Sequence, residues 1–243
     1  MMTKKNYNQP NGDIEFTGEV WIPGKTPHRI EQDHLERYYF ASQFVKGKTI
    51  LDIACGVGGG SRMLAQAGAE KVVGVDINPK YISYARKFNS HPAITYIKRD
   101  VQRFTYHTSF DVIIFYETIE HLVYYRQVLL TLNKLLNRRG RLIISTPNRQ
   151  ITSPGSKSLG SKPRNSYHQQ EFTIPEMTSL LKSIGLSIPP DFIFGQRYRW
   201  FFPHPYFNNL YQRIFSPDNN SSSVVRRSRF LTPRYFIVVA QKP

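Results

Sequence analysis

The chain has 243 residues, enough for one large α/β domain with a small attachment. Hydrophobic residues make up 40% of it, so a sizeable core can form and global disorder is excluded. A single cysteine, Cys55, excludes a disulfide scaffold and a multi-cysteine zinc module. No apolar run reaches the roughly 18–20 residues of a membrane span, and the first residues lack the apolar stretch of a signal peptide. We therefore expect a soluble cytoplasmic protein.

The charge balance is strongly basic. Lys and Arg number 33 and Asp and Glu number 17, which gives a net charge of +16. The stretch from His121 to Gln170 holds nine basic residues and no acidic one. Such a surplus favours an anionic partner, either a phosphorylated metabolite, a nucleic acid or an anionic membrane surface. A basic surface with no specific partner accounts for it equally well.

The first 145 residues predict a strand and helix alternation behind a polar lead-in. Residues 1–30 are polar, contain Gly and Pro and lack a period, so we interpret them as a flexible lead-in. Helices separate the strands that follow, which predicts βαβ units and a mostly parallel sheet. The predicted helices are 31–45, 61–67, one beginning at Asn78-Pro79, and 122–136, and the predicted strands are 48–54, 71–75, 93–97, 110–115 and 141–145.

The last hundred residues predict a long loop, a helix and two more strands. Residues 146–170 are rich in Pro, Gly, Ser and basic residues, and a loop of this length is usually functional or mobile. Thr173 and Glu176 form a capping box ahead of a helix over 177–184. Strands are predicted at 191–194 and 234–240, and between them lies an insertion, 197–233, dense in aromatic residues. The whole pattern predicts an α/β, Rossmann-like fold with a seven-stranded sheet over residues 31–243.

A glycine-rich turn after the first strand carries the clearest ligand signal. The buried strand 50–54 leads into glycines at 56, 58, 59 and 60 and then into a helix. Glycines allow a tight turn and a close approach of a ligand. Asp76 follows Gly56 by 20 residues at the end of the second strand, where its carboxylate can bind both ribose hydroxyls. A nicotinamide dinucleotide fits these features nearly as well, and an ordinary strand-to-helix turn is the plain alternative.

Three further details argue against a nicotinamide dinucleotide as the ligand. Ser61 stands where the dinucleotide fingerprint has its third glycine, Asp52 stands four residues before Gly56, and Asp100 follows the third strand. With these residues the chain resembles the class I S-adenosylmethionine-dependent methyltransferases. The resemblance implies that the turn contacts the methionine part, Asp76 the ribose and Asp100 the adenine amino group. The implied cofactor-binding set is Arg37, Asp52, Gly56, Gly58, Asp76, Ile77, Asp100, Val101 and Tyr116.

Arg37 lies on the predicted N-terminal helix, which in related methyltransferases covers the cofactor. The resemblance therefore implies that Arg37 pairs with the methionine carboxylate, although a solvated arginine explains the residue as well.

A second cluster, Glu117-Thr118-Ile119-Glu120-His121, follows the fourth strand. If this segment is a helical turn, the spacing i, i+3, i+4 places the carboxylates and the imidazole on one face. They could cap a helix N-terminus or hold a divalent ion through oxygen and nitrogen ligands. His168 supplies a second histidine just before a later helix.

These segments are similar to those of two metal-dependent groups, the ubiquinone-biosynthesis O-methyltransferases and the small-RNA 3′-terminal 2′-O-methyltransferases. The resemblance implies that Glu117, Glu120, His121 and His168 are ligands of a cation such as Mg²⁺. Bacterial methyltransferases that act on sugars or secondary metabolites share the segments with no metal implied. A structural cap with a substrate-facing histidine is therefore the alternative.

The resulting hypothesis is methyl transfer from S-adenosylmethionine to a small-molecule acceptor, such as a secondary metabolite, a sugar or a quinone-like compound. Oxygen is the favoured nucleophile and nitrogen the alternative. His121 or His168 would remove the proton of a hydroxyl. The rival acceptor is RNA, at a 2′-hydroxyl, although no RNA-binding module is recognisable. Outside the class, a nicotinamide-dependent oxidoreductase would share the sheet and Asp76, and a nucleic-acid-binding module without catalysis would explain the charge.

Overall fold

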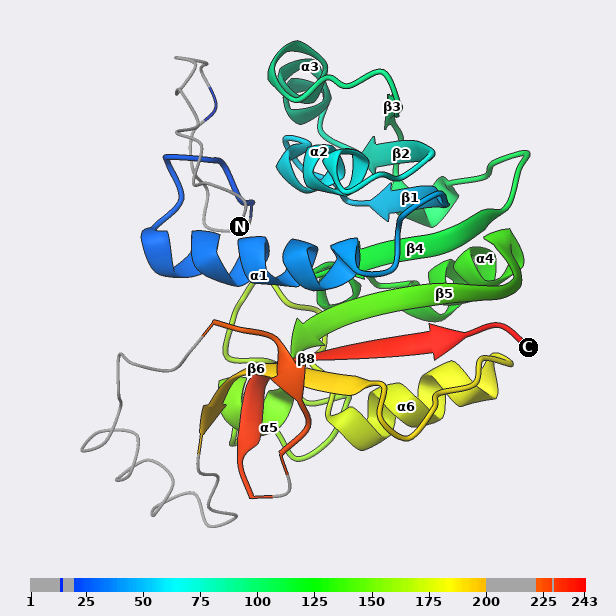
Figure 1. Cartoon of the computed structure of the whole chain (residues 1–243). Coiled ribbons are helices and arrows are strands. Elements are labelled where there is room, and N and C mark those ends of the chain that lie inside the picture. Colours follow the sequence, from blue (N-terminus) through cyan, green and yellow to red (C-terminus); the bar gives the residue numbers. More distant parts are fainter. Residues whose placement is uncertain (1–13, 15–19, 200–221, 229) are drawn as a thin grey trace. The chain divides into compact units, whose positions relative to one another are not determined.

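A computed structural model describes residues 14, 20–199, 222–228 and 230–243. The chain forms two compact units, Met1–Val101 and Gln102–Pro243 (Figure 1). The proposed division between a lead-in, residues 1–30, and a domain from residue 31 stays a prediction. Trp21 and Ile22, which fall in that lead-in, are both buried.

The first unit is a three-stranded parallel sheet with three helices. Its strands lie side by side in the order β3-β2-β1. The bounds are α1 (His28–Ser42), β1 (Thr49–Ile53), α2 (Gly59–Gln66), β2 (Lys71–Asp76), α3 (Pro79–Phe88) and β3 (Ile94–Lys98), and a 3-10 turn, η1 (Val101–Arg103), begins at the end of the unit. Ile53 pairs with Val75, and Val75 pairs with Ile97. The carboxyl ends of all three strands therefore meet at one edge of the sheet, where ligands bind in open parallel sheets.

Local sequence explains where the elements of this unit begin. The Asn78 side chain accepts a hydrogen bond from the Lys80 backbone N–H, and Pro79 occupies the first turn of α3, where a missing N–H costs nothing. Four of the five residues of β1 are buried, as expected for a parallel strand covered on both faces.

The second unit contains the other five strands, in the order β4-β5-β8-β6-β7. The bounds are β4 (Phe110–Tyr116), η2 (Ile119–His121), α4 (Tyr125–Leu135), β5 (Leu136–Pro147), α5 (Arg149–Thr152), α6 (Ile174–Ser183), β6 (Ile193–Arg199), β7 (Val225–Arg226) and β8 (Thr232–Gln241). Strands β4 and β5 pair in parallel, and β8 runs antiparallel to both β5 and β6 (Figure 1).

The α/β class and the mostly parallel sheet are confirmed, because β1 to β5 all pair in parallel within their units. Within the described residues the strand count is eight, which corrects the predicted seven. The additional strand, β7, has two residues and lies inside the predicted insertion 197–233. Two residues are too short for the period-2 pattern by which a strand is found in a sequence.

Other differences concern boundaries. β5 begins at Leu136, five residues before the predicted start, because Leu136 already pairs with Phe110. The short helix α5 interrupts the predicted loop 146–170. Most of the aromatic segment 198–215 lies outside the described residues.

None of the helices in the described part of the chain is long and apolar enough to cross a bilayer. The cytoplasmic location expected from the sequence stays a prediction.

Candidate functional site

The turn after β1 has an unusual backbone. Ala54, Gly56 and Gly58 all have positive φ angles, of 57°, 56° and 80°. Glycine adopts this region freely, whereas alanine does so at a cost. Strained non-glycine residues of this kind cluster at functional sites. The turn that the sequence predicted is therefore present at the end of β1, and the binding of a ligand there stays a prediction.

The glycines of this turn also make room for neighbouring side chains. A Cβ on Gly58 would lie 2.5 Å from the Tyr96 hydroxyl oxygen, and one on Gly60 would overlap the ring of Tyr38. A Cβ on Gly59 would lie 3.0 Å from the ring of Trp21. The sequence pattern indicated close approach by a ligand, and it did not reveal that α1 and the segment before it pack on the same turn.

Asp52 lies beneath this turn and is 0% exposed. Its Oδ1 accepts a hydrogen bond from the Tyr38 hydroxyl at 3.1 Å, and its Oδ2 accepts one from Ser61 Oγ at 2.6 Å. Burial raises the pKa of Asp52 to about 7, and the two hydrogen bonds oppose that shift. Asp52 thus connects α1, β1 and α2.

Asp76 closes β2 beside the same turn. Its Oδ2 accepts a hydrogen bond from the Gly56 N–H at 2.9 Å, and its Oδ1 accepts one from the Asn78 N–H at 2.8 Å. Burial raises the pKa of Asp76, although backbone hydrogen bonds oppose the shift. The next residue, Ile77, is a large apolar side chain with 61% of its surface exposed. The edge of the sheet therefore presents an oriented carboxylate next to an apolar surface.

The remaining predicted cofactor residues have these positions. Asp100 is half-buried and follows β3 by two residues, and Val101 opens η1. Arg37 lies on α1 and is 2% exposed. Tyr116 is the last residue of β4 and belongs to the second unit.

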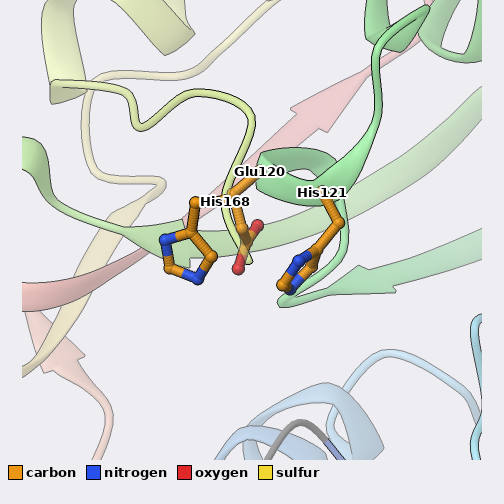
Figure 2. Close-up of side chains that lie close together, drawn as sticks. All are labelled: Glu120, His121 and His168. Atoms are coloured by element: carbon orange, nitrogen blue, oxygen red, sulfur yellow. The ribbon is translucent and has the colours of Figure 1, made fainter. Parts of the chain in front are cut away.

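In the second unit, Glu120, His121 and His168 lie close together (Figure 2). One potential ligand atom from each lies within 4.8 Å of the others, and the imidazole ring centroids are 5.0 Å apart at an interplanar angle of 79°. The three residues come from η2 and from the loop before α6, which are remote in sequence. The structure therefore brings together three of the four predicted metal ligands.

The fourth predicted ligand, Glu117, is not among the three residues whose ligand atoms lie within 4.8 Å of one another. Its Oε1 accepts a hydrogen bond from Ser145 Oγ at 2.7 Å, and its backbone has a φ of 45°. The sequence placed Glu117, Glu120 and His121 on one face of a helical turn. The observed 3-10 turn covers only Ile119–His121, so Glu117 precedes it and the helical spacing does not apply.

Hydrogen bonds orient each side chain of the cluster. His121 Nδ1 lies 3.0 Å from the carbonyl oxygen of Tyr167. A carbonyl only accepts, so this nitrogen carries the proton. Glu120 Oε2 accepts a hydrogen bond from Thr146 Oγ1 at 3.0 Å.

His168 has a carboxylate partner that the sequence analysis did not identify. Its Nδ1 lies 2.7 Å from Glu171 Oε1, and its Nε2 lies 3.0 Å from Asn165 Nδ2. Burial alone would raise the pKa of Glu171, but hydrogen bonds from His168, Thr152 and Ser153 lower it overall. Glu171 is therefore ionised, and its Oε1 accepts a hydrogen bond from the His168 Nδ1–H. The i, i+3 spacing of Asn165, His168 and Glu171 was the only signal in the sequence, and it is weak.

Comparisons with known proteins show which family the chain resembles. A family model described as a methyltransferase domain matches residues 51–144. A ubiquinone biosynthesis O-methyltransferase from Bradyrhizobium diazoefficiens is 31% identical over 190 residues, covering 69% of this chain and 75% of the relative. A protein of Mycolicibacterium smegmatis, named "Probable S-adenosylmethionine-dependent methyltransferase", is 27% identical over 177 residues. That match covers 72% of this chain but only 66% of the relative's length.

Solved structures show the same fold. The crystal structure of an S-adenosylmethionine-dependent methyltransferase from Mesorhizobium loti superposes with a TM-score of 0.60 at 16% identity. The superposition covers 85% of this chain and 98% of the other.

Proposed function

Because this chain belongs to the class I S-adenosylmethionine-dependent methyltransferases, we propose that it transfers a methyl group from S-adenosylmethionine to a small-molecule acceptor. The observation that carries this proposal is the Asp76 carboxylate, held beside the glycine turn by the N–H groups of Gly56 and Asn78. A carboxylate at this edge of a parallel sheet accepts hydrogen bonds from ribose hydroxyls.

Most of the proposed cofactor-binding residues belong to the first unit. The turn over residues 52–58 would hold the methionine part, and Arg37 would pair with its carboxylate. The exposed Ile77 side chain offers an apolar surface to the adenine, whose amino group would meet Asp100. Val101 and Tyr116 complete the proposed set.

The proposed chemistry is an in-line displacement at the methyl carbon. An oxygen lone pair of the acceptor forms the new C–O bond, while the electron pair of the breaking C–S bond passes to sulfur and yields S-adenosylhomocysteine. The hydroxyl proton passes to an imidazole nitrogen of His168 or His121. Alignment of the three reacting atoms supplies much of the rate acceleration.

Relatives named ubiquinone biosynthesis O-methyltransferases support oxygen as the nucleophile and a quinone-like acceptor. A sugar or another secondary metabolite would use the same proton acceptors, and an amine nucleophile would need only to arrive neutral.

The cluster of Glu120, His121 and His168 also offers ligands for a divalent cation such as Mg²⁺. In this alternative form of the reaction the cation, and not a histidine, would activate the hydroxyl. The cluster offers one carboxylate and two imidazoles within 4.8 Å, and the Nδ1 atoms of both histidines are occupied by acceptors, as metal-binding histidines usually are. A bound cation would lower the pKa of an acceptor hydroxyl. With a cation at this cluster, RNA with a terminal 2′-hydroxyl is the second candidate acceptor.

Calorimetric titration tests the cofactor. We expect S-adenosylhomocysteine to bind and NAD(H) not to bind, and the reverse result would overturn the proposal. A transfer assay with methyl-labelled S-adenosylmethionine then tests the acceptor. It should label catechols, phenols or sugars in preference to an RNA oligonucleotide, and labelling of RNA alone would establish the second candidate.

A further inference from the structure

The Glu171 side chain is a buried carboxylate in contact with the histidine cluster. It is 1% exposed and lies just before α6. Its Oε1 lies 2.7 Å from His168 Nδ1, and its Oε2 accepts a hydrogen bond from Thr152 Oγ1 at 2.6 Å. Thr152 is the last residue of α5, so the carboxylate is fixed from two directions.

The Arg149 guanidinium, which also contacts Glu171, binds groups other than the Glu171 carboxylate. Arg149 Nη1 donates to the backbone carbonyl of Glu171 at 2.8 Å, and its Nη2 pairs with Glu176 at 2.6 Å. The Glu171 carboxylate itself faces His168 Nδ1 at 2.7 Å, a contact that becomes an ion pair when His168 is protonated. A desolvated carboxylate interacts strongly with whatever charge develops beside it, because the surrounding dielectric is low.

We propose that Glu171 is a positioning residue that holds His168 in its Nδ1–H tautomer, so that Nε2 is available as the proton acceptor for the acceptor hydroxyl. The catalytic part of this inference rests on the methyl transfer proposed above. This arrangement is that of a carboxylate, imidazole and hydroxyl triad. In such a triad the carboxylate fixes the tautomer of the imidazole and stabilises the imidazolium that forms.

Asn165 occupies the position of that hydroxyl in this structure. Its Oδ1 accepts a hydrogen bond from the Tyr167 N–H at 3.0 Å, which identifies Nδ2 as the atom that faces His168 Nε2. An amide N–H donates, so His168 Nε2 is the acceptor of this bond. An incoming hydroxyl would replace Asn165 as the donor to the same lone pair.

The proton released by the acceptor hydroxyl is taken up by His168. When the acceptor oxygen forms its bond to the methyl carbon, its proton moves to His168 Nε2, and the C–S electron pair moves to sulfur. His168 becomes an imidazolium that carries a proton on both nitrogens, and its charge faces the Glu171 carboxylate.

The tautomer can be measured without any acceptor. We would label the histidines of the EDTA-treated full-length protein with ¹⁵N and record two- and three-bond ¹H–¹⁵N correlations at pH 8. Wild-type His168 should show a protonated Nδ1. Glu171→Gln, which keeps an acceptor oxygen, should retain this pattern, whereas Glu171→Met should shift His168 toward the Nε2–H form. His121 is the internal control, because its Nδ1 donates to a backbone carbonyl that neither variant changes.

A protonated Nε2 in wild-type His168 would overturn the inference without any variant. An unchanged tautomer in a Glu171→Met protein with a native near-ultraviolet circular dichroism spectrum would also overturn it. Neither tautomer measurement depends on methyl transfer. The S-adenosylhomocysteine titration and the transfer assay test the proposed function separately.

Kinetics supply a second readout once the transfer assay identifies an acceptor. Glu171→Gln should lower kcat by roughly 10- to 100-fold and leave KM for the acceptor within about twofold, because the charge beside the imidazolium is lost while binding is kept. A rise in KM with unchanged kcat would contradict a positioning role.

Discussion

The ring of Tyr38 lies against the backbone of Gly60, at the place where any other residue would carry its Cβ. The same tyrosine donates its hydroxyl hydrogen bond to Asp52 at 3.1 Å. One side chain of α1 thus touches both the helix that follows the glycine turn and the carboxylate beneath that turn. The helix α1 is therefore packed directly on the structure around the glycine turn of the first unit.

Gly60→Ala should destabilise the protein by about 1–3 kcal/mol, because the added methyl group overpacks a site filled by the Tyr38 ring. Glycine-to-alanine changes inside helices normally stabilise a protein by up to about 1 kcal/mol. The sign of the change in the free energy of unfolding therefore tests the packing of Tyr38 on Gly60. Urea denaturation measures the free energy of unfolding.

Two controls accompany this variant. Gly155→Ala should be close to neutral, because nothing lies within 4 Å of the added Cβ. In the double variant Tyr38→Ala, Gly60→Ala, the two effects should fall short of additivity, since removing the ring removes the overlap. Full additivity, or a Gly60→Ala protein as stable as the wild type, would contradict the packing.

Asp52→Asn should make folding stability less dependent on pH. The pKa of Asp52 is raised by burial from 3.8 to about 7, so the folded state binds a proton more tightly than the unfolded state. Stability therefore falls as pH rises from about 4 to about 7, and the loss is complete above that window. Asparagine carries no charge, so the variant should gain stability at pH 8 relative to wild type, by an amount on the order of a few kcal/mol.

Thermal unfolding at pH 5 and pH 8 measures this effect. Asparagine can still accept from Tyr38 and donate to Ser61, so the comparison isolates the charge. Some pH dependence should remain, because burial also raises the pKa of Asp76. An Asp52→Asn protein that loses stability at pH 8 would show that the carboxylate is stabilising.

Asp76→Asn should weaken S-adenosylhomocysteine binding by roughly 10- to 100-fold in calorimetric titration. The amide has one acceptor oxygen where the carboxylate has two, and bonds to a charged acceptor are about twice as strong as neutral ones. Glu70→Gln is the matched control, since Glu70 is an exposed acid in the turn before β2. Equal affinity in both variants would remove Asp76 from the cofactor site.

The sequence predicted the alternation of β1 to β5 with helices because buried parallel strands appear as short apolar runs between turn residues. It also predicted the positions of Asp76 and the glycine turn, since both follow strands directly. It did not predict β7, whose two residues carry no period, or the early start of β5. Pairing with a distant strand decided that boundary, and local sequence does not contain this information.

In the second unit, too, the sequence predicted only part of the candidate site. The proximity of His168 to Glu120 and His121 was expected from a resemblance, and the structure brings these side chains together. The contribution of Glu171 was missed, because a carboxylate three residues after a histidine is common and becomes informative only when both side chains are buried. In the first unit, the contact between Tyr38 and Gly60 was not predicted, because Gly60 lies 22 residues away on another helix.

Glu120→Gln should weaken Mg²⁺ or Mn²⁺ binding by at least tenfold, whereas Glu117→Gln should leave it within about twofold. Glu120 contributes a ligand atom within 4.8 Å of atoms from His121 and His168, whereas Glu117 accepts a hydrogen bond from Ser145 Oγ at 2.7 Å and lies outside the cluster. Calorimetric titration of the EDTA-treated protein with each cation measures both affinities, and the paired variants control for the loss of one negative charge. Equal losses in the two variants would restore the four-ligand site that the sequence implied, and no binding by the wild-type protein would leave the histidines as the only proton acceptors of the cluster.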